Sequence, residues 1–247
     1  MNISNEKAEY LNVCSKIFES SGNSVDFLGK RNIWIARRLD NPTFLLAKYL
    51  IYQAIAKTSA NQLSIAAYDP ILSGVFAPFY KLSTGENRII ELIRDEEDFN
   101  RLLNNLRYEV QSVQNVIQGR ANSLIEFREK EQKPIESYKL VVLCMNMRTV
   151  LEKRYEFFFN LLNRGPAAGI SFLIISLETF EEGECPRTIH DLDPNMAILK
   201  PGNVTDNKGT VEIVKGNGAS KLTVTYGIPT PLLLIKFCES VEKMNLR

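Results

Sequence analysis

A short turn between an apolar strand and an apolar helix carries residues that could bind an anion. Asn32 to Ile35 (NIWI) has the β-branched and apolar character of a short buried strand, and Phe44 to Lys57 (FLLAKYLIYQAIAK) has apolar residues at helical spacing. The turn between them, ARRLDNPT, holds two arginines and a threonine. Arg37, Arg38 and Thr43 could bind an anion there, because the free N–H groups at a helix N-terminus favour negative charge.

The turn has the length of a phosphate-binding loop of the form GxxxxGK[ST], but it lacks most of the residues of that motif. In such a loop the glycines let backbone N–H groups surround the phosphates, the lysine neutralises them and the hydroxyl holds magnesium. Here Ala36 stands at the first glycine, Asn41 at the second and Pro42 at the lysine, and only Thr43 agrees with the motif. Pro42 offers an anion neither a charge nor an N–H group.

A structural interpretation of the same turn stays open beside the functional one. Asp40 and Asn41 can cap the helix, with Pro42 in its first turn, where proline is well tolerated. Arg37 and Arg38 are then solvated turn residues beside Asp40. This interpretation predicts a good helix start and a poor phosphate site.

The order of the apolar segments predicts the fold that would position this turn. After NIWI come LSIAAYDP (Leu63 to Pro70), a long charged helical region from Glu96 to Lys133 that breaks near Gly119, YKLVVLCMNM (Tyr138 to Met147) and RGPAAGISFLIIS (Arg164 to Ser176). The four apolar runs are too continuous for half-exposed strands. We therefore expect them to be central strands of one mostly parallel sheet with helices on both faces.

This order resembles the motor domain of the FtsK/HerA-type (FtsK/SpoIIIE-like) DNA translocases, a RecA-like branch of the P-loop ATPases. In that family the strand after the P-loop helix commonly ends in Asp-Pro, matched here by Asp69 and Pro70, and a later turn has the form GRxxGI, matched in its glycines by Gly165 and Gly169. The resemblance covers residues 33–175. It implies a RecA-like P-loop NTPase fold and ring assemblies with ATPase-like domains or with copies of the same chain.

The departures from the family pattern fall on its chemistry. The family's Walker B strand ends in Asp-Glu, and LVVLCM places Cys144 at the magnesium-binding aspartate and Met145 at the glutamate that activates water. A thiol or a thioether there replaces neither carboxylate at neutral pH. The arginine of GRxxGI is Pro166 here, with Arg164 two residues earlier as an imperfect substitute.

Together these residues predict a degenerate ATPase domain in which the Walker A and Walker B residues are lost. The expected function is that of a catalytically inactive, structural or regulatory part of a DNA-translocase-like assembly, so the chain is not expected to be an enzyme. We expect no catalytic residue, no metal and no cofactor, and ATP is not expected to bind. The alternatives are a nucleotide- or anion-binding sensor without turnover, through Arg37, Arg38 and Thr43, and an ATPase-like domain of a protein-secretion motor.

The flank that carries Arg164 and the charged helical region is the surface expected to face a neighbouring ATPase-like domain. DNA contact is expected only through such an assembly, because 30 basic and 29 acidic residues leave a net charge of +1. No run of apolar residues is long enough to span a membrane, and the N-terminus lacks the pattern of a signal peptide, so a cytoplasmic location is expected.

The remaining composition predicts a single sizeable domain with a short extension. Residues 1–30 should form an N-terminal helical extension and residues 31–247 the degenerate ATPase domain, within which residues 179–247 supply a β-hairpin and a closing helix. Four widely spaced cysteines and one histidine do not make a zinc site. His190 beside Asp191 could form a dyad, although an unremarkable loop histidine is the simpler interpretation.

Overall fold

The computed structural model of the chain describes most of the sequence outside the N-terminal region. The described residues are 10, 12, 25–36, 40–58, 62–84, 88–132, 137–145, 157–177, 193, 195–215 and 220–245. Within these ranges no helix is both long enough and apolar enough to cross a membrane.

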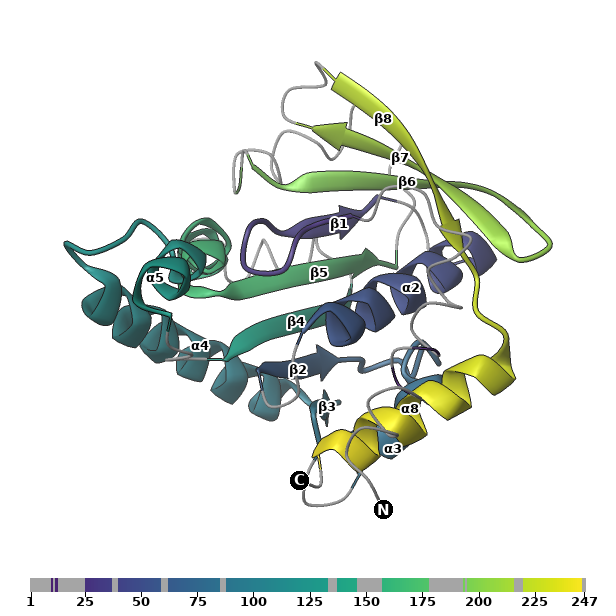
Figure 1. Ribbon diagram of the computed structural model, residues 1–247, viewed down its shortest axis with the longest axis horizontal. Helices are drawn as coiled ribbons and strands as arrows, with labels where there is room; N and C mark the ends of the chain where they lie inside the picture. The colour runs from purple at the N-terminus through teal and green to yellow at the C-terminus, as the bar shows by residue number, and fades with distance from the viewer. Residues whose placement is uncertain are drawn as a thin grey trace.

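One eight-stranded sheet organises the fold, in the order β3-β2-β4-β5-β1-β6-β7-β8 (Figure 1). Its first six strands pair in parallel. They are β1 (Ile33–Ile35), β2 (Leu63–Tyr68), β3 (Ile90–Ile93), β4 (Tyr138–Met145), β5 (Ile170–Ser176) and β6 (Ala197–Thr205). The four apolar runs predicted as central parallel strands are β1, β2, β4 and β5, so that prediction is confirmed. The short strand β3 and the strand β6 were not predicted.

The C-terminal part of the chain continues the same sheet in the opposite sense. Strand β7 (Lys208–Lys215) pairs antiparallel with β6, and β8 (Ser220–Gly227) pairs antiparallel with β7. The predicted hairpin and closing helix are therefore confirmed, the helix being α8 (Pro231–Asn245). Figure 1 shows β7 and β8 rising from the sheet beside β6.

Helices cover both faces of the sheet. Side chains alternate between the two faces along each strand, and since the strands are apolar throughout, both faces must be buried. On one face Ile35 and Val142 pack with α2 (Asn41–Lys57), α3 (Tyr80–Ser83) and α8. On the other face Trp34 and Val141 pack with α4 (Glu96–Ile117), α5 (Leu124–Glu131) and a helix of residues 157–164. In Figure 1, α2 and α8 lie on the same side of the sheet, where the rings of Tyr52 and Phe237 are 4.0 Å apart.

The start of α2 and the break in the charged region follow the sequence closely. Asp40 caps α2, and Pro42 lies in its first turn, as the structural interpretation of the turn predicts. The charged region is two helices, α4 and α5, separated around Gly119, whose φ of +75° only glycine adopts easily.

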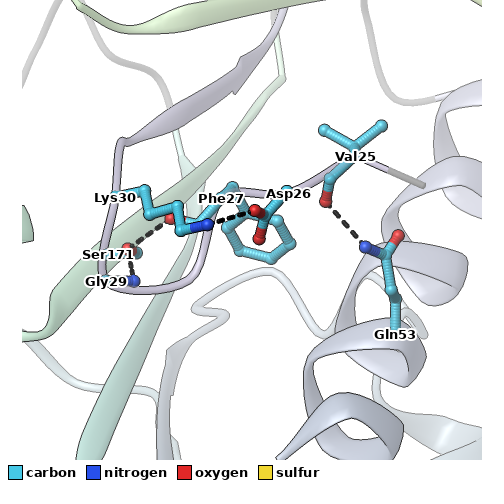
Figure 2. A network of polar contacts seen from close by, with 7 residues as sticks. All are labelled: Val25, Asp26, Phe27, Gly29, Lys30, Gln53 and Ser171. Atoms are coloured by element: carbon cyan, nitrogen blue, oxygen red, sulfur yellow. Dashed lines mark hydrogen bonds and ion pairs between the residues drawn. The ribbon is translucent and has the colours of Figure 1, made fainter. Parts of the chain in front are cut away.

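A hydrogen-bonded loop leads into β1 and fixes its position (Figure 2). Ser171 of β5 accepts a hydrogen bond from the backbone N–H of Gly29 at 2.8 Å and donates one to the carbonyl of Phe27 at 3.1 Å. The amide of Gln53 on α2 donates to the carbonyl of Val25 at 2.7 Å. The loop therefore ties β5 and α2 to the entry of β1. Of the predicted N-terminal extension, only Tyr10, Asn12 and residues 25–30 are described, and the Tyr10 ring lies 5.9 Å from that of Phe237.

Asn32, the last residue before β1, is fully buried and links three parts of the chain. Its side-chain amide donates to the carbonyl of Leu162 and to the carboxylate of Asp193, both at 2.7 Å, and its amide oxygen accepts from the N–H of Phe172 at 2.9 Å. A buried polar group is costly unless it is hydrogen-bonded. The Asn32 amide therefore fixes β1 against β5, and with it the start of the turn that follows β1.

Replacing Asn32 with alanine should destabilise the protein strongly. Three buried hydrogen bonds are lost, each contributing roughly 1 kcal/mol, and the carboxylate of Asp193 loses a donor, so we expect the free energy of unfolding to fall by about 3 kcal/mol. Urea denaturation of N32A measures this change. The matched control is N104A on the exposed side of α4, which should cost less than about 0.5 kcal/mol. An equal cost for the two variants would contradict the assigned role of Asn32.

Candidate functional site

The candidate site lies at the edge of the sheet where the parallel strands end. Strand register pairs Ile35 of β1 with Ile175 of β5, and Met145 of β4 with Ser176 of β5. The turn after β1 and the end of β4 therefore meet at the same edge, with β5 between them. In open parallel sheets this is the edge at which ligands bind.

Hydrogen bonds within the chain already use the N-terminus of α2. The Oδ1 atom of Asp40 accepts a hydrogen bond from the backbone N–H of Thr43 at 3.0 Å. Pro42, which lies directly before Thr43 in the first turn, has no N–H. Of the backbone N–H groups that a phosphate would need, that of Thr43 is therefore already bound to a carboxylate. Position 42 has no N–H group to offer.

The predicted site residues are only partly placed by the structure. Thr43 lies in the first turn of α2, as its alignment with the phosphate-binding loop requires, and its side chain is fully buried. Arg37 and Arg38 lie outside the described residues, as do His190 and Asp191. Of Arg37, Arg38 and Thr43, the structure therefore describes Thr43, whose backbone N–H is hydrogen-bonded to the Asp40 carboxylate.

Tyr226 of β8 covers the same helix start and was missed by sequence reasoning. Its hydroxyl donates to the carbonyl of Pro42 at 3.4 Å, and its ring centroid lies 5.2 Å from that of Tyr49 on α2. Burial, followed by the negative charge of Asp40, raises the pKa of Tyr226 to about 12, so the hydroxyl stays protonated and can donate. Gly209 of β7 makes room for this ring, since a Cβ there would lie 2.3 Å from it.

The end of β4 carries Cys144 and Met145, at the two positions that the family resemblance gives to acidic residues. Cys144 is fully buried and Met145 is 8% exposed. Burial, with a smaller contribution from the charge of Asp69, raises the pKa of the Cys144 thiol to about 12. The thiol is therefore protonated at neutral pH, and a buried, protonated thiol is unreactive.

The Asp-Pro sequence after β2 closes a local turn. Both carboxylate oxygens of Asp69 accept from the backbone N–H of Ser73, at 2.9 and 3.0 Å, and Oδ2 also accepts from the Ser73 hydroxyl at 2.9 Å. The Ser73 hydroxyl lies 3.8 Å from the sulfur of Cys144. Asp69 therefore holds the loop that passes the end of β4, and its oxygens are engaged in that task.

The two glycines matched to GRxxGI have packing reasons of their own. Gly169 has a φ of +81°, and a Cβ there would lie 2.5 Å from Leu124. A Cβ on Gly165 would lie 2.6 Å from the carbonyl oxygen of Leu161. Both glycines let the chain turn sharply from the helix of residues 157–164 into β5, and Arg164 is exposed just before that turn.

The described part of the chain contains no cluster of three or more His, Cys, Asp or Glu side chains that could hold a metal ion. Its two described cysteines, Cys144 and Cys238, are free and buried.

Comparison with known proteins identifies the fold. No protein-family model matches the sequence, and no curated protein matches it significantly. Among solved structures, the cytoplasmic domain of the Type VII secretion ATPase EccC of Thermomonospora curvata matches with a TM-score of 0.59 and 15% identity, over 85% of this chain and 28% of that one. ATPases 2 and 3 of EssC from Geobacillus thermodenitrificans match with a TM-score of 0.60 and 14% identity, over 87% of this chain and 43% of that one.

A third similar structure is a conjugation protein. The pCW3 conjugation coupling protein TcpA, in a monomer form with ATPγS, matches with a TM-score of 0.60 and 13% identity, over 87% of this chain and 67% of that one. All three neighbours are FtsK/HerA-type ATPase domains, and at these identities they establish the fold alone. The chain thus has the RecA-like P-loop ATPase fold, as predicted, and it spans less than half the length of the two secretion ATPases.

Removing the Asp40 carboxylate should weaken the start of α2. D40A loses the hydrogen bond to the N–H of Thr43, so we expect the free energy of unfolding to fall by about 1 kcal/mol. D40N is the matched control, because asparagine caps a helix as well as aspartate does and should cost little. Urea denaturation compares the two variants. If D40A were as stable as the native chain, Asp40 would not be the cap that holds this turn.

Proposed function

We propose that this domain is a non-catalytic member of an FtsK/HerA-like assembly, in which it serves a structural or regulatory role. The observation that carries this proposal is the hydrogen bond from the Thr43 N–H to the Asp40 carboxylate. It places a negative charge and a used donor at the point where an active loop presents N–H groups to phosphate.

The other half of the site supports the same proposal. Hydrolysis needs a metal held near the γ-phosphate and a group that orients the attacking water. The buried thiol of Cys144 and the thioether of Met145 occupy the strand end where the related motors carry those carboxylates. Loss of the phosphate loop and loss of the metal site are independent defects, and each is sufficient to stop turnover.

A domain without turnover can still serve an assembly of ATPases. Family motors work as rings in which a neighbour completes each site, so an inactive domain can supply one side of an interface. The neighbours in such an assembly are ATPase-like domains or copies of this chain, and contact with DNA is made through the assembly.

A protein-secretion motor is a second candidate for the assembly in which this domain serves. Two of the similar structures are secretion ATPases, and a further match is ATPases 2 and 3 of EccC in complex with a signal sequence peptide, with a TM-score of 0.60 and 12% identity. TcpA, from conjugation, matches equally well. The comparisons therefore favour neither process, and the proposal of an inactive ATPase-like domain holds for both.

Purified protein should not hydrolyse ATP above background in the presence of magnesium and DNA. Neither the lysine of the phosphate loop nor the two carboxylates of the metal strand is present, and these groups act as a unit in hydrolysis. Phosphate release, measured by a colorimetric assay, tests this prediction. The matched variant is P42K, which returns the lysine but leaves Cys144 and Met145 unchanged, and it should also be inactive.

A single result would overturn the proposal. Robust phosphate release that is abolished by T43A would mean that the turn before α2 is a working nucleotide site. Release that persists unchanged in T43A would come from a contaminating ATPase.

A further inference from the structure

A groove of about 450 Å³ lies between α4 and the helix of residues 157–164, on the face of the sheet opposite α2. The two helices also contact each other through Phe99 and Phe158, whose ring centroids are 6.4 Å apart. The groove is lined by Arg107, Val110, Gln111, Gln114, Phe157, Asn160, Leu161 and Arg164. No acidic side chain lines it within the described part of the chain.

Helical spacing gathers the polar groups of the groove into two facing rows. Arg107, Gln111 and Gln114 are four and three residues apart on α4, and Asn160 and Arg164 are four apart on the second helix, so each row follows one side of its helix. Both rows present guanidinium and amide N–H donors. Between them lies apolar surface from Val110, Phe157 and Leu161.

Several cations of this face pair with acidic side chains, but in the described part of the chain the two arginines of the groove do not. Arg101 forms an ion pair with Asp98, and Lys130 forms one with Glu126 at 2.6 Å. Glu109, two residues after Arg107 on α4, pairs with Lys139 of β4. Among the described residues Arg107 and Arg164 make no ion pair, although both line the groove. The described lining of the groove therefore carries two arginines that have no ion-pair partner among the described residues.

We propose that this groove is a docking site for an acidic amphipathic helix of a partner protein. Carboxylates on such a helix would pair with Arg107 and Arg164, and its apolar side would cover Val110, Phe157 and Leu161, as in other helix-in-groove complexes. Arginine pairs well with carboxylate because its planar group donates two parallel hydrogen bonds. The inference rests on the proposed function in one respect, namely that the domain acts through partners in an assembly.

Charge and shape favour this occupant over a nucleic acid. A nucleic-acid backbone is bound through many phosphate contacts, and the groove offers two arginines on a chain with a net charge of +1. The apolar surface of Val110, Phe157 and Leu161 contributes nothing to phosphate binding, but it can pack against the leucine side chains of an amphipathic helix.

The probe is a fluorescein-labelled, capped peptide of about 15 residues that repeats glutamate four residues apart with leucines between. Its binding to the whole chain is followed by fluorescence anisotropy at low ionic strength. The R107Q/R164Q double variant removes both charges of the groove. The matched control is R101Q/R120Q, which removes two charges from exposed positions outside the groove on the same side of the sheet.

We expect the native chain and the control to bind the peptide equally, and R107Q/R164Q to bind it roughly tenfold more weakly or worse, since two charge-assisted contacts are lost. A control peptide in which glutamine replaces every glutamate should bind all three proteins as weakly as R107Q/R164Q binds the acidic peptide. All variants are checked for the native melting temperature, because exposed arginines contribute little to folding.

Three results would overturn the inference. The first is the absence of binding up to about 1 mM peptide. The second is equal binding of the peptide by R107Q/R164Q and the native chain. The third is tighter binding of a single-stranded DNA of similar length than of the peptide, if that DNA binding is abolished in R107Q/R164Q. None of these results depends on ATP, so a failure here is distinct from a failure of the proposed function, which phosphate release tests.

Discussion

The hydrogen bond between the Asp40 carboxylate and the N–H of Thr43 is the interaction on which the candidate site depends. The first turn of every helix leaves N–H groups without partners, and these can be satisfied by an anion from solution or by a side chain from within the chain. In this chain the Asp40 carboxylate is the partner of one of these N–H groups. Because Asp40 precedes the helix directly, the cap forms without any ligand, and its negative charge opposes the arrival of another anion.

The fold does not require the chemistry that similar folds are built to perform. The sheet is held by parallel pairing of apolar strands, by helices on both faces and by the buried amide of Asn32. Gly165 and Gly169 are required by close contacts and by one positive φ, and Asp69 is required by the turn at Ser73. Each of these residues has a structural task that does not depend on hydrolysis. Under the proposed function, this explains why the strand and turn pattern can persist with Cys144, Met145 and Pro42 at the positions of the reacting groups.

Much of this structure could be predicted from the sequence, for identifiable physical reasons. Continuous apolar runs such as KLVVLCM indicate strands buried on both faces, and Asp40 with Pro42 indicates a helix start. Strand β3 was missed because Glu91 and its short length make it look like part of a charged region. Strand β6 was missed because Pro201 and Gly202 interrupt its pattern. Tyr226 could not be assigned to the site, since only the tertiary fold brings β8 against the start of α2.

The measurement that tests the central claim most directly is a thermal unfolding curve of the native chain with and without millimolar MgATP. A ligand present at a hundred times its dissociation constant stabilises the folded state by about 2.7 kcal/mol, which corresponds to a rise of several degrees in melting temperature for a chain of this size. If the N-terminus of α2 is closed by Asp40, the melting temperature should be the same with and without MgATP. A rise of several degrees that T43A abolishes would contradict the account.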